Sequence, residues 1–357
     1  MKISTPLLSL SPTHEFLRLV GSPFANRTRE NFNSTQAKIQ NASRLYHYAT
    51  KNRMSLLYLE ALKRLDILAP LRKEYNKLVD KYAKTNQAIY RVSQVLDRTG
   101  VNYTFFKSIR PYQEVTVDID ILVFGSCAEY EKVVQVLRRV GYVFLGSGPL
   151  SVTFRDSEAG INLDLYYEVG ASHMIYLDKD GLERFVCERK LSNGELVFSL
   201  FSEADLLAVI AHSVVKEHMY VLSEYYTTLY YLADMEEEAL KSFLSLVDKC
   251  KVRSAVKTHL GITALLHYEA HRFLPARLVR LLERLEVNQL ELSRVEKTGF
   301  DMPHKYHPIT TIKALVEKFG EEKARRSFAS QFLRMLNLKF TSSLMKDVFQ
   351  HVSRESY

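Results

Sequence analysis

The sequence predicts an α+β protein in which a mixed β-sheet domain is flanked by N-terminal and C-terminal helical regions. Residues 29–98 and the residues after 236 carry apolar side chains at helical spacing. Between them, residues 101–194 contain short apolar runs that alternate with polar residues, as strands do. A chain of 357 residues is long for one core. We therefore expect three parts: residues 1–100, 101–200 and 201–357.

Composition restricts the class of protein. The cysteines Cys127, Cys187 and Cys250 lie far apart without CxxC spacing, so neither a disulfide framework nor a zinc site is expected. This usage favours a reducing cytoplasm. The chain has no apolar run of about 18 residues and no apolar signal segment at its N-terminus, so we expect a soluble protein without a membrane span.

Charge is distributed unevenly along the chain. The net charge is +10 over residues 1–100, −11 over residues 101–240 and +9 over residues 241–357. An acidic centre between two basic arms suits a metal-dependent site flanked by surfaces that bind a polyanion. The alternative is that the basic helices simply have solvated polar faces.

The N-terminal region is predicted to be helical. Residues 1–27 form an irregular arm or a short helix near residues 15–20. Leu56, Leu59, Leu62 and Leu65 then recur at near-helical spacing, and Gly100 closes the last helix. Two or three helices should therefore precede the sheet.

The central region is predicted to alternate strands and turns. VNYTFF (101–106) and VTVDIDILV (115–123) are expected strands, and a helix over residues 128–140 stops at Gly141. YVFL (142–145), LSVTFR (150–155) and INLDLYYEV (161–169) follow as a meander.

Carboxylates gather on one face of these strands. In an extended VDIDILV segment, Asp118 and Asp120 share a face opposite the apolar side chains. Two like charges so close raise one pKa or repel unless a cation lies between them, and oxygen ligands suit Mg²⁺ or Mn²⁺. Asp164, on a later strand of the same pattern, adds a third carboxylate, enough for a two-metal phosphoryl-transfer site. The alternative is a solvated edge strand with surface aspartates.

The segment FFKSIRPYQEVTVDIDILV, followed by a helix and a distant hDh strand, resembles the nucleotidyltransferase fold of the DNA polymerase β superfamily. More narrowly, it is similar to the motif region of the minimal and uncharacterised nucleotidyltransferase families, in which a Lys-Gly or Gly-Ser pair precedes an Arg or Pro segment and then DIDLLV. The resemblance covers residues 101 to about 235.

This resemblance implies roles for individual residues. Asp118 and Asp120 would hold the metals that bridge the nucleotide phosphates, and Asp164 would complete the site and help to deprotonate the attacking hydroxyl. Ser108 would contact the β- and γ-phosphates. The usual glycine beside that serine is absent, and Lys107 and Arg110 could supply charge instead. Solvent-facing basic residues are the alternative for these two.

A helix is predicted from residue 203, with Ser202 as its N-cap. His212 and Lys216 are four residues apart and share a face. By resemblance, such a pair lies near the triphosphate, where Lys216 would stabilise the pyrophosphate leaving group. A structural helix with an incidental His and Lys is the alternative.

The C-terminal region is predicted to be helical. His304 and His307 are expected to be loop histidines. The last helices interleave basic residues with aromatic ones, which could grip phosphates and stack bases or could fill the helical core. The residues are Lys323, Arg325, Arg326, Arg334 and Lys339 with Phe328, Phe332 and Phe340.

Together these features predict an enzyme that transfers NMP from an NTP to a hydroxyl group, with Mg²⁺ or Mn²⁺ as cofactor. The basic arms favour RNA as the acceptor, in particular a tRNA 3′ end. Some members of the families it resembles act as toxins that modify tRNA or proteins. The alternative is a catalytically silent nucleotide- or RNA-binding protein of the same fold, and the sequence does not indicate an oligomeric state.

Overall fold

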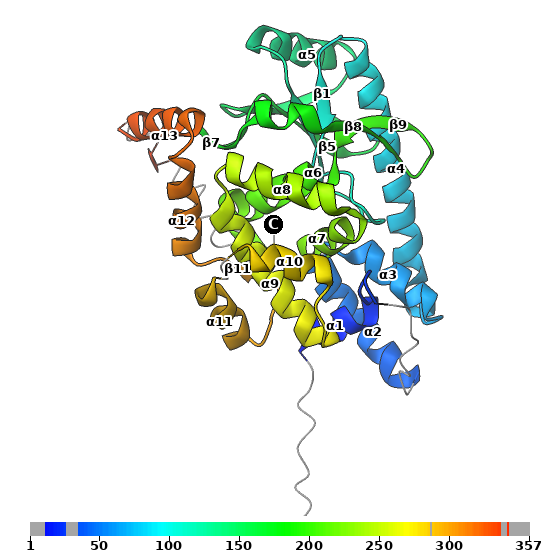
Figure 1. Cartoon of the computed structure of the whole chain (residues 1–357). Coiled ribbons are helices and arrows are strands. Elements are labelled where there is room, and N and C mark those ends of the chain that lie inside the picture. The colour runs from blue at the N-terminus through cyan, green and yellow to red at the C-terminus, as the bar shows by residue number, and fades with distance from the viewer. Residues whose placement is uncertain (1–10, 26–34, 286–287, 337–340, 343–357) are drawn as a thin grey trace, which may run out of the picture.

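A computed structural model describes residues 11–25, 35–285, 288–336 and 341–342, with the backbone alone for residues 35–41. The sheet and the helix α5 lie at the top of Figure 1, and a mass of helices lies below them. The long helix α4 runs along one side and joins the two parts.

The N-terminal region is helical, as predicted. Its elements are α1 (Pro12–Val20), α2 (Thr35–Lys51), α3 (Ser55–Arg64), the 3₁₀ turn η1 (Ala69–Leu71) and α4 (Arg72–Asp97). The hydroxyl of Ser11 caps α1 by accepting from the backbone N–H of His14, so the predicted short helix near residues 15–20 is confirmed. Residues 1–10 and 26–34 lie outside the described part.

A mixed sheet of seven strands forms the centre, in the order β3-β4-β5-β2-β1-β9-β8. The strands are β1 (Tyr103–Phe105), β2 (Asp118–Val123), β3 (Val143–Ser147), β4 (Ser151–Asp156), β5 (Ile161–Tyr166), β8 (Val186–Lys190) and β9 (Leu196–Leu200). The pairs β2/β5 and β1/β9 are parallel, and the other pairs are antiparallel. The predicted α+β class and the meander of β3, β4 and β5 are confirmed.

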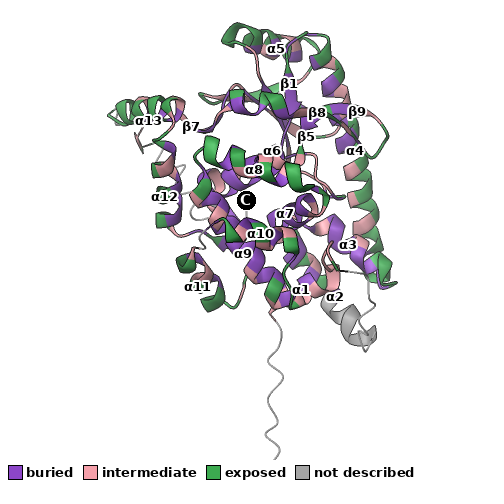
Figure 2. Ribbon diagram, viewed as in Figure 1, coloured by how far each residue is buried: buried purple, intermediate pink, exposed green. Residues whose placement is uncertain are grey.

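The two faces of the sheet belong to different cores. Ile119, Ile121 and Val123 of β2 pack on one face with apolar residues of α4 and of α5 (Cys127–Arg139). Leu122 and Tyr166 point to the other face, where they join the larger core that the helices share. Figure 2 shows the resulting buried interior and the exposed outer face of α4. The alternation read from VDIDILV is therefore confirmed.

Four strands of the central region were not predicted. The hairpin of β8 and β9 closes the sheet beside β1, and β6 (Val169–Ala171) pairs with β7 (Met174–Leu177) in a small second sheet. The sequence carried a signal for the hairpin, because Asn193-Gly194 separates two strand-like runs. Two short 3₁₀ turns, η2 (Lys179–Gly181) and η3 (Glu183–Phe185), connect these strands.

The C-terminal region is mostly helical. It contains α6 (Ser202–Ala211), the π-helical turn η4 (His212–Glu217), β10 (Met219–Tyr220), α7 (Leu222–Asp234), α8 (Glu237–Lys249), α9 (Arg253–His271), α10 (Ala276–Glu283), α11 (Gln289–Lys297), β11 (His304–Lys305), α12 (Pro308–Lys318) and α13 (Glu322–Met335). The prediction of Ser202 as N-cap is wrong. Phe201 holds that position without a side-chain cap, and the nearby carboxylate of Asp205 is used in a tertiary contact instead.

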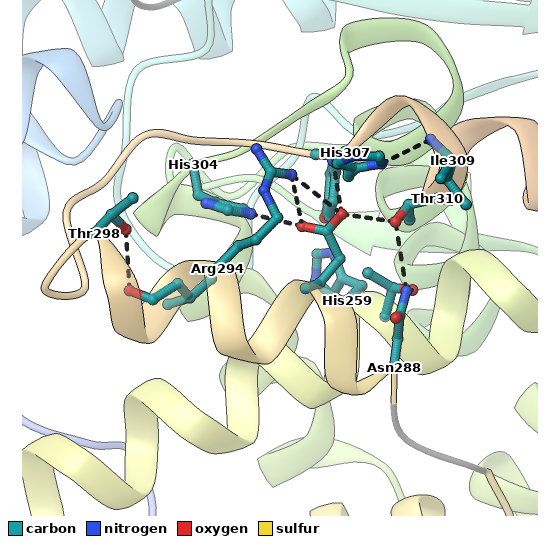
Figure 3. Close-up of polar contacts among 12 residues, drawn as sticks. His259, Asn288, Arg294, Thr298, His304, His307, Ile309 and Thr310 are labelled. Carbon is teal, nitrogen blue, oxygen red and sulfur yellow. Dashed lines mark hydrogen bonds and ion pairs between the residues drawn. The ribbon is translucent and has the colours of Figure 1, made fainter.

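A buried polar cluster joins α11, β11 and α12 (Figure 3). The carboxylate of Glu291 accepts from the Nε2 of His304 at 2.8 Å, the backbone N–H of His307 at 2.6 Å and the hydroxyl of Thr310 at 2.7 Å. The prediction of His304 as a loop histidine is therefore wrong. His304 lies buried in β11, because Glu291 of α11 supplies a hydrogen-bond partner for its imidazole. His307 caps α12 through its Nδ1.

The predictions on membrane spans, cysteines and domain division concern the whole chain. Within the described residues, no helix combines the length and apolar character needed to cross a membrane. The three cysteines are unpaired, as predicted. The larger core contains residues from α1 to α12. The division at residues 100 and 200 therefore stays a prediction.

Candidate functional site

The parallel register of β2 and β5 brings the three predicted aspartates together. Asp118 is opposite Asn162, and Asp120 is opposite Asp164. One carboxylate oxygen of each aspartate lies within 4.8 Å of the others. Thr153 of β4 donates to Asp164 at 2.6 Å and fixes its orientation. The surface-aspartate alternative is wrong for Asp120, which is buried.

Lys107 places an ammonium group among these carboxylates. Its Nζ lies 3.2 Å from Oδ1 of Asp120, and both side chains are buried. Burial alone would raise the pKa of Asp120, but Lys107 and the nearby cations outweigh it and lower that pKa. Burial and the charge of Asp120 raise the pKa of both Asp118 and Asp164. Lys107 therefore favours the charged form of Asp120, whereas the raised pKa values of Asp118 and Asp164 make their charged forms more costly than in isolated aspartates.

Lys107 also has an unusual backbone. Its φ is +62°, in the left-handed region that favours glycine. In the nucleotidyltransferase families that this segment resembles, a glycine stands beside the serine. The carboxylate of Asp205 on α6 holds the turn by accepting from the N–H of Lys107 at 2.6 Å. The ion pair with Asp120 and this contact offset the strain of a non-glycine residue here.

Ser108 stabilises the same turn. Its hydroxyl accepts from the N–H of Asp120 at 2.7 Å and donates to the carbonyl of Phe106 at 3.2 Å. The side chain is buried and does not line the pocket described next. In this state Ser108 therefore positions the Asp120 strand and leaves its hydroxyl committed within the fold.

A narrow pocket of about 80 Å³ opens over Asp118 and Asp120. Cations from three separate segments line it: Arg53 from the turn between α2 and α3, Lys107 and Arg110 from the turn after β1, and Lys216 from η4. The sequence analysis missed Arg53, since nothing in its local pattern indicates that the N-terminal helices reach this site. Three glutamates line the pocket as well, and this mixture of carboxylates and cations suits a polyphosphate bound through a metal ion.

His212 and Lys216, which the spacing placed on one face of a helix, both line this pocket from the π-helical turn η4. The Nδ1 of His212 lies 3.2 Å from Nζ of Lys107 and 3.1 Å from the hydroxyl of Tyr176, and its Nε2 lies 3.2 Å from Glu217. Burial and the two lysines lower the pKa of His212 to about 3, so this histidine is a neutral hydrogen-bonding group. Lys216 donates to the hydroxyl of Tyr166 at 3.3 Å.

Glu114 connects the pocket to the N-terminal region. Its buried carboxylate accepts from the backbone N–H groups of Leu56 and Leu57, which begin α3, and from that of Val115. Burial raises the pKa of Glu114 to about 7. The contact holds the loop between β1 and β2 against α3, and α3 follows the turn that carries Arg53.

The residues present fit a divalent metal. The donor set consists of carboxylate oxygens, which hard cations such as Mg²⁺ and Mn²⁺ prefer. Crowding and burial raise the pKa of two of the carboxyl groups even with Lys107 beside them, and a divalent ion would favour the charged form of all three. Asp118, Asp120 and Asp164 can therefore hold a metal.

No protein-family model matches the chain, and no curated protein is similar enough to match it. Among solved structures, the chain is similar to the structure of the STING-associated CdnE c-di-GMP synthase from Capnocytophaga granulosa. The identity is 13% over 84% of this chain and 98% of that chain, with a TM-score of 0.28. A similarity with so low a TM-score does not establish a shared function, so the functional assignment rests on the side chains described above.

Proposed function

We propose that the protein is a metal-dependent nucleotidyltransferase that moves NMP from an NTP to a hydroxyl acceptor. The observation that carries this proposal is the triad of Asp118, Asp120 and Asp164 on two parallel strands, beside a pocket that four cationic side chains help to line. The resemblance of residues 101 to about 235 to nucleotidyltransferases supports the same chemistry.

In this reaction the acceptor oxygen bonds to the α-phosphorus, the bond from that phosphorus to the β-phosphate oxygen breaks, and pyrophosphate leaves. Asp118, Asp120 and Asp164 would hold Mg²⁺ or Mn²⁺, which would supply positive charge to the phosphates. Asp164 accepts the proton of the acceptor hydroxyl. Lys107, Arg110 and Lys216 stabilise the charge that develops on pyrophosphate, and Ser108 keeps Asp120 in place.

A second candidate is a catalytically silent nucleotide- or RNA-binding protein of the same fold. The observation that favours it is the ammonium group of Lys107, which lies 3.2 Å from Oδ1 of Asp120 and so already pairs with a carboxylate that a metal would need. The two candidates differ in whether a divalent ion displaces that ammonium group.

Purified protein incubated with each α-labelled NTP, Mg²⁺ or Mn²⁺ and total RNA distinguishes them. We expect wild-type protein to incorporate label, and we expect EDTA or Asp118→Ala to abolish incorporation. The matched control is Asp180→Asn, an exposed carboxylate away from the triad. Absence of transfer to RNA, protein or small acceptors by wild-type protein would leave the silent protein as the correct assignment.

We further propose that the acceptor is RNA, in particular a tRNA 3′ end, and that the activity is a toxin-like modification. The support is the basic charge of the two terminal regions. On α13, Arg325 and Arg326 are exposed, and Arg326 pairs with Glu322 on the same helix. Lys323 forms ion pairs with Glu168, Asp178 and Asp180. Phe328 is buried in the core and Phe332 is exposed, and Lys339 and Phe340 lie outside the described residues.

Replacing Arg325 and Arg326 with alanine is expected to weaken RNA binding and to flatten its salt dependence. Each lost phosphate contact reduces the slope of log affinity against log salt by about 1. Filter binding at several salt concentrations measures this, with Arg139→Ala as a control, because Arg139 is exposed in the acidic central region. Unchanged affinity and slope would remove α13 from the RNA-binding surface.

A further inference from the structure

A larger pocket lies beside the metal site. Its volume is about 490 Å³, within the range of roughly 300 to 1,000 Å³ typical of small-molecule sites. We call it the Arg189 pocket. Its walls come from α4, the turn after β1, the end of β8 and the end of α7, and they include Tyr82, Arg110, Arg189, Lys190, Tyr230 and Asp234.

The chemistry of this pocket favours an anion. Three cationic side chains, Arg110, Arg189 and Lys190, line it against one carboxylate, the exposed Asp234. Among the described residues, no carboxylate lies within ion-pair distance of any of the three. The guanidinium of Arg110 donates only to Thr227, through one of its nitrogens. The remaining N–H donors of a guanidinium match phosphate oxygens in pairs.

Aromatic side chains complete the lining. Tyr82 and Tyr230 are half-buried and line the same space, where a flat ring can stack on them. Because phosphate and ring are joined in a nucleotide, cations and tyrosines in one pocket of this volume suit a ligand of nucleotide size. The 80 Å³ pocket over the triad is much smaller.

The Arg189 pocket is connected to the metal site. Arg110 lines both pockets. Arg189 donates to the carbonyl of Ile109 at 2.9 Å and to the hydroxyl of Tyr231 at 3.2 Å. Tyr231 in turn donates to Asp205, which holds the N–H of Lys107. Hydrogen bonds through Tyr231 and Asp205 therefore link a ligand on Arg189 to the turn that carries Lys107.

We propose that the Arg189 pocket binds a phosphate-bearing group of the acceptor, supplied either as a free nucleotide or as the terminal nucleotide of an RNA. The acceptor role rests on the proposed function, whereas binding itself does not require metal or turnover. The pocket is then a second ligand site, separate from the metal-bound NTP.

Calorimetric titration with AMP and with pyrophosphate in EDTA tests the site apart from catalysis. We expect saturable binding by the wild-type protein and by Asp120→Asn, and about tenfold weaker binding by Lys190→Glu and Arg189→Gln, since one phosphate contact is worth about 1.4 kcal/mol. Arg189 supports the turn, so Lys190→Glu, at an exposed residue, keeps the test valid if Arg189→Gln does not fold. Arg98→Glu is the control, because it makes the same charge change outside the pocket.

Binding of neither probe at millimolar concentration, or equal binding by wild type and Lys190→Glu, would overturn the proposal. Incubation of the protein with labelled NTP, metal and AMP, with or without RNA, identifies the source of the ligand. Label joined to AMP supports a free nucleotide, and label on RNA with competition by AMP supports an RNA end. Transfer that neither uses AMP nor is inhibited by it would overturn the acceptor role while leaving the proposed function intact.

Discussion

An Asp120→Asn variant is expected to transfer nucleotide at least about 1,000-fold more slowly than wild type, equivalent to about 4 kcal/mol of transition-state stabilisation. Asp120 is the buried member of the triad, lies beside both Asp118 and Asp164, and carries the charge that Lys107 neutralises. An amide keeps the shape but offers one weak oxygen ligand. Initial rates with saturating NTP and metal measure the loss.

The buried Lys107 loses its charged partner in this variant, so we expect a less stable fold, and circular dichroism at the assay temperature must show that the variant is folded. Asparagine retains the backbone N–H that donates to Ser108, and it leaves the apolar face of β2 unchanged. Glu188→Gln, an exposed carboxylate on the same sheet, is the matched control and should transfer at the wild-type rate. A folded Asp120→Asn variant with more than a tenth of wild-type activity would show that the triad does not hold the metal.

A Glu291→Ala variant is expected to destabilise the protein by about 3 to 5 kcal/mol, because each buried donor that loses its acceptor costs about 1 to 3 kcal/mol. Glu291 is fully buried and accepts from His304, His307 and Thr310 (Figure 3). Its removal leaves three donors in the interior without an acceptor. Urea denaturation followed by circular dichroism measures the change in the free energy of unfolding.

The contribution of Glu291 depends on pH in a defined direction. Burial alone would raise its pKa, but the hydrogen bonds from His304, Thr310 and the backbone outweigh burial and lower it. A depressed pKa stabilises the folded state above the unfolded value of 4.5, and that stability is lost as the pH falls below it. Glu296→Ala, exposed on the same helix, should change stability by less than about 0.5 kcal/mol. A similarly small effect of Glu291→Ala would show that the cluster does not hold α11, β11 and α12 together.

Much of the fold follows from local pattern. The alternation of VDIDILV placed Ile119 and Ile121 in one core and the two aspartates on the other face, because a strand turns successive side chains to opposite faces. The meander from β3 to β5 and the helix α5 followed from turn residues and helical spacing. The hairpin of β8 and β9 was missed although Asn193-Gly194 indicated it.

Long-range contacts decided the rest of the candidate site. Whether Arg53 reaches the pocket depends on how α2 and α3 pack against the loop that Glu114 holds. Likewise, Ser202 failed as a cap and Asp205 became the partner of Lys107, since a tertiary contact outweighed the local preference. The Arg189 pocket joins segments more than 100 residues apart, and no local pattern encodes such a surface.

By itself, the sequence determined which carboxylates share a strand face and that an acidic centre lies between basic regions. Only the tertiary structure decided that β2 and β5 are parallel neighbours with Asp120 opposite Asp164, and that Lys107 turns its ammonium group onto Asp120. The physical reason is that the two-residue period of a strand is a local property of the backbone. Strand register and ion pairing depend on hydrogen bonds and packing between segments that lie far apart in the sequence.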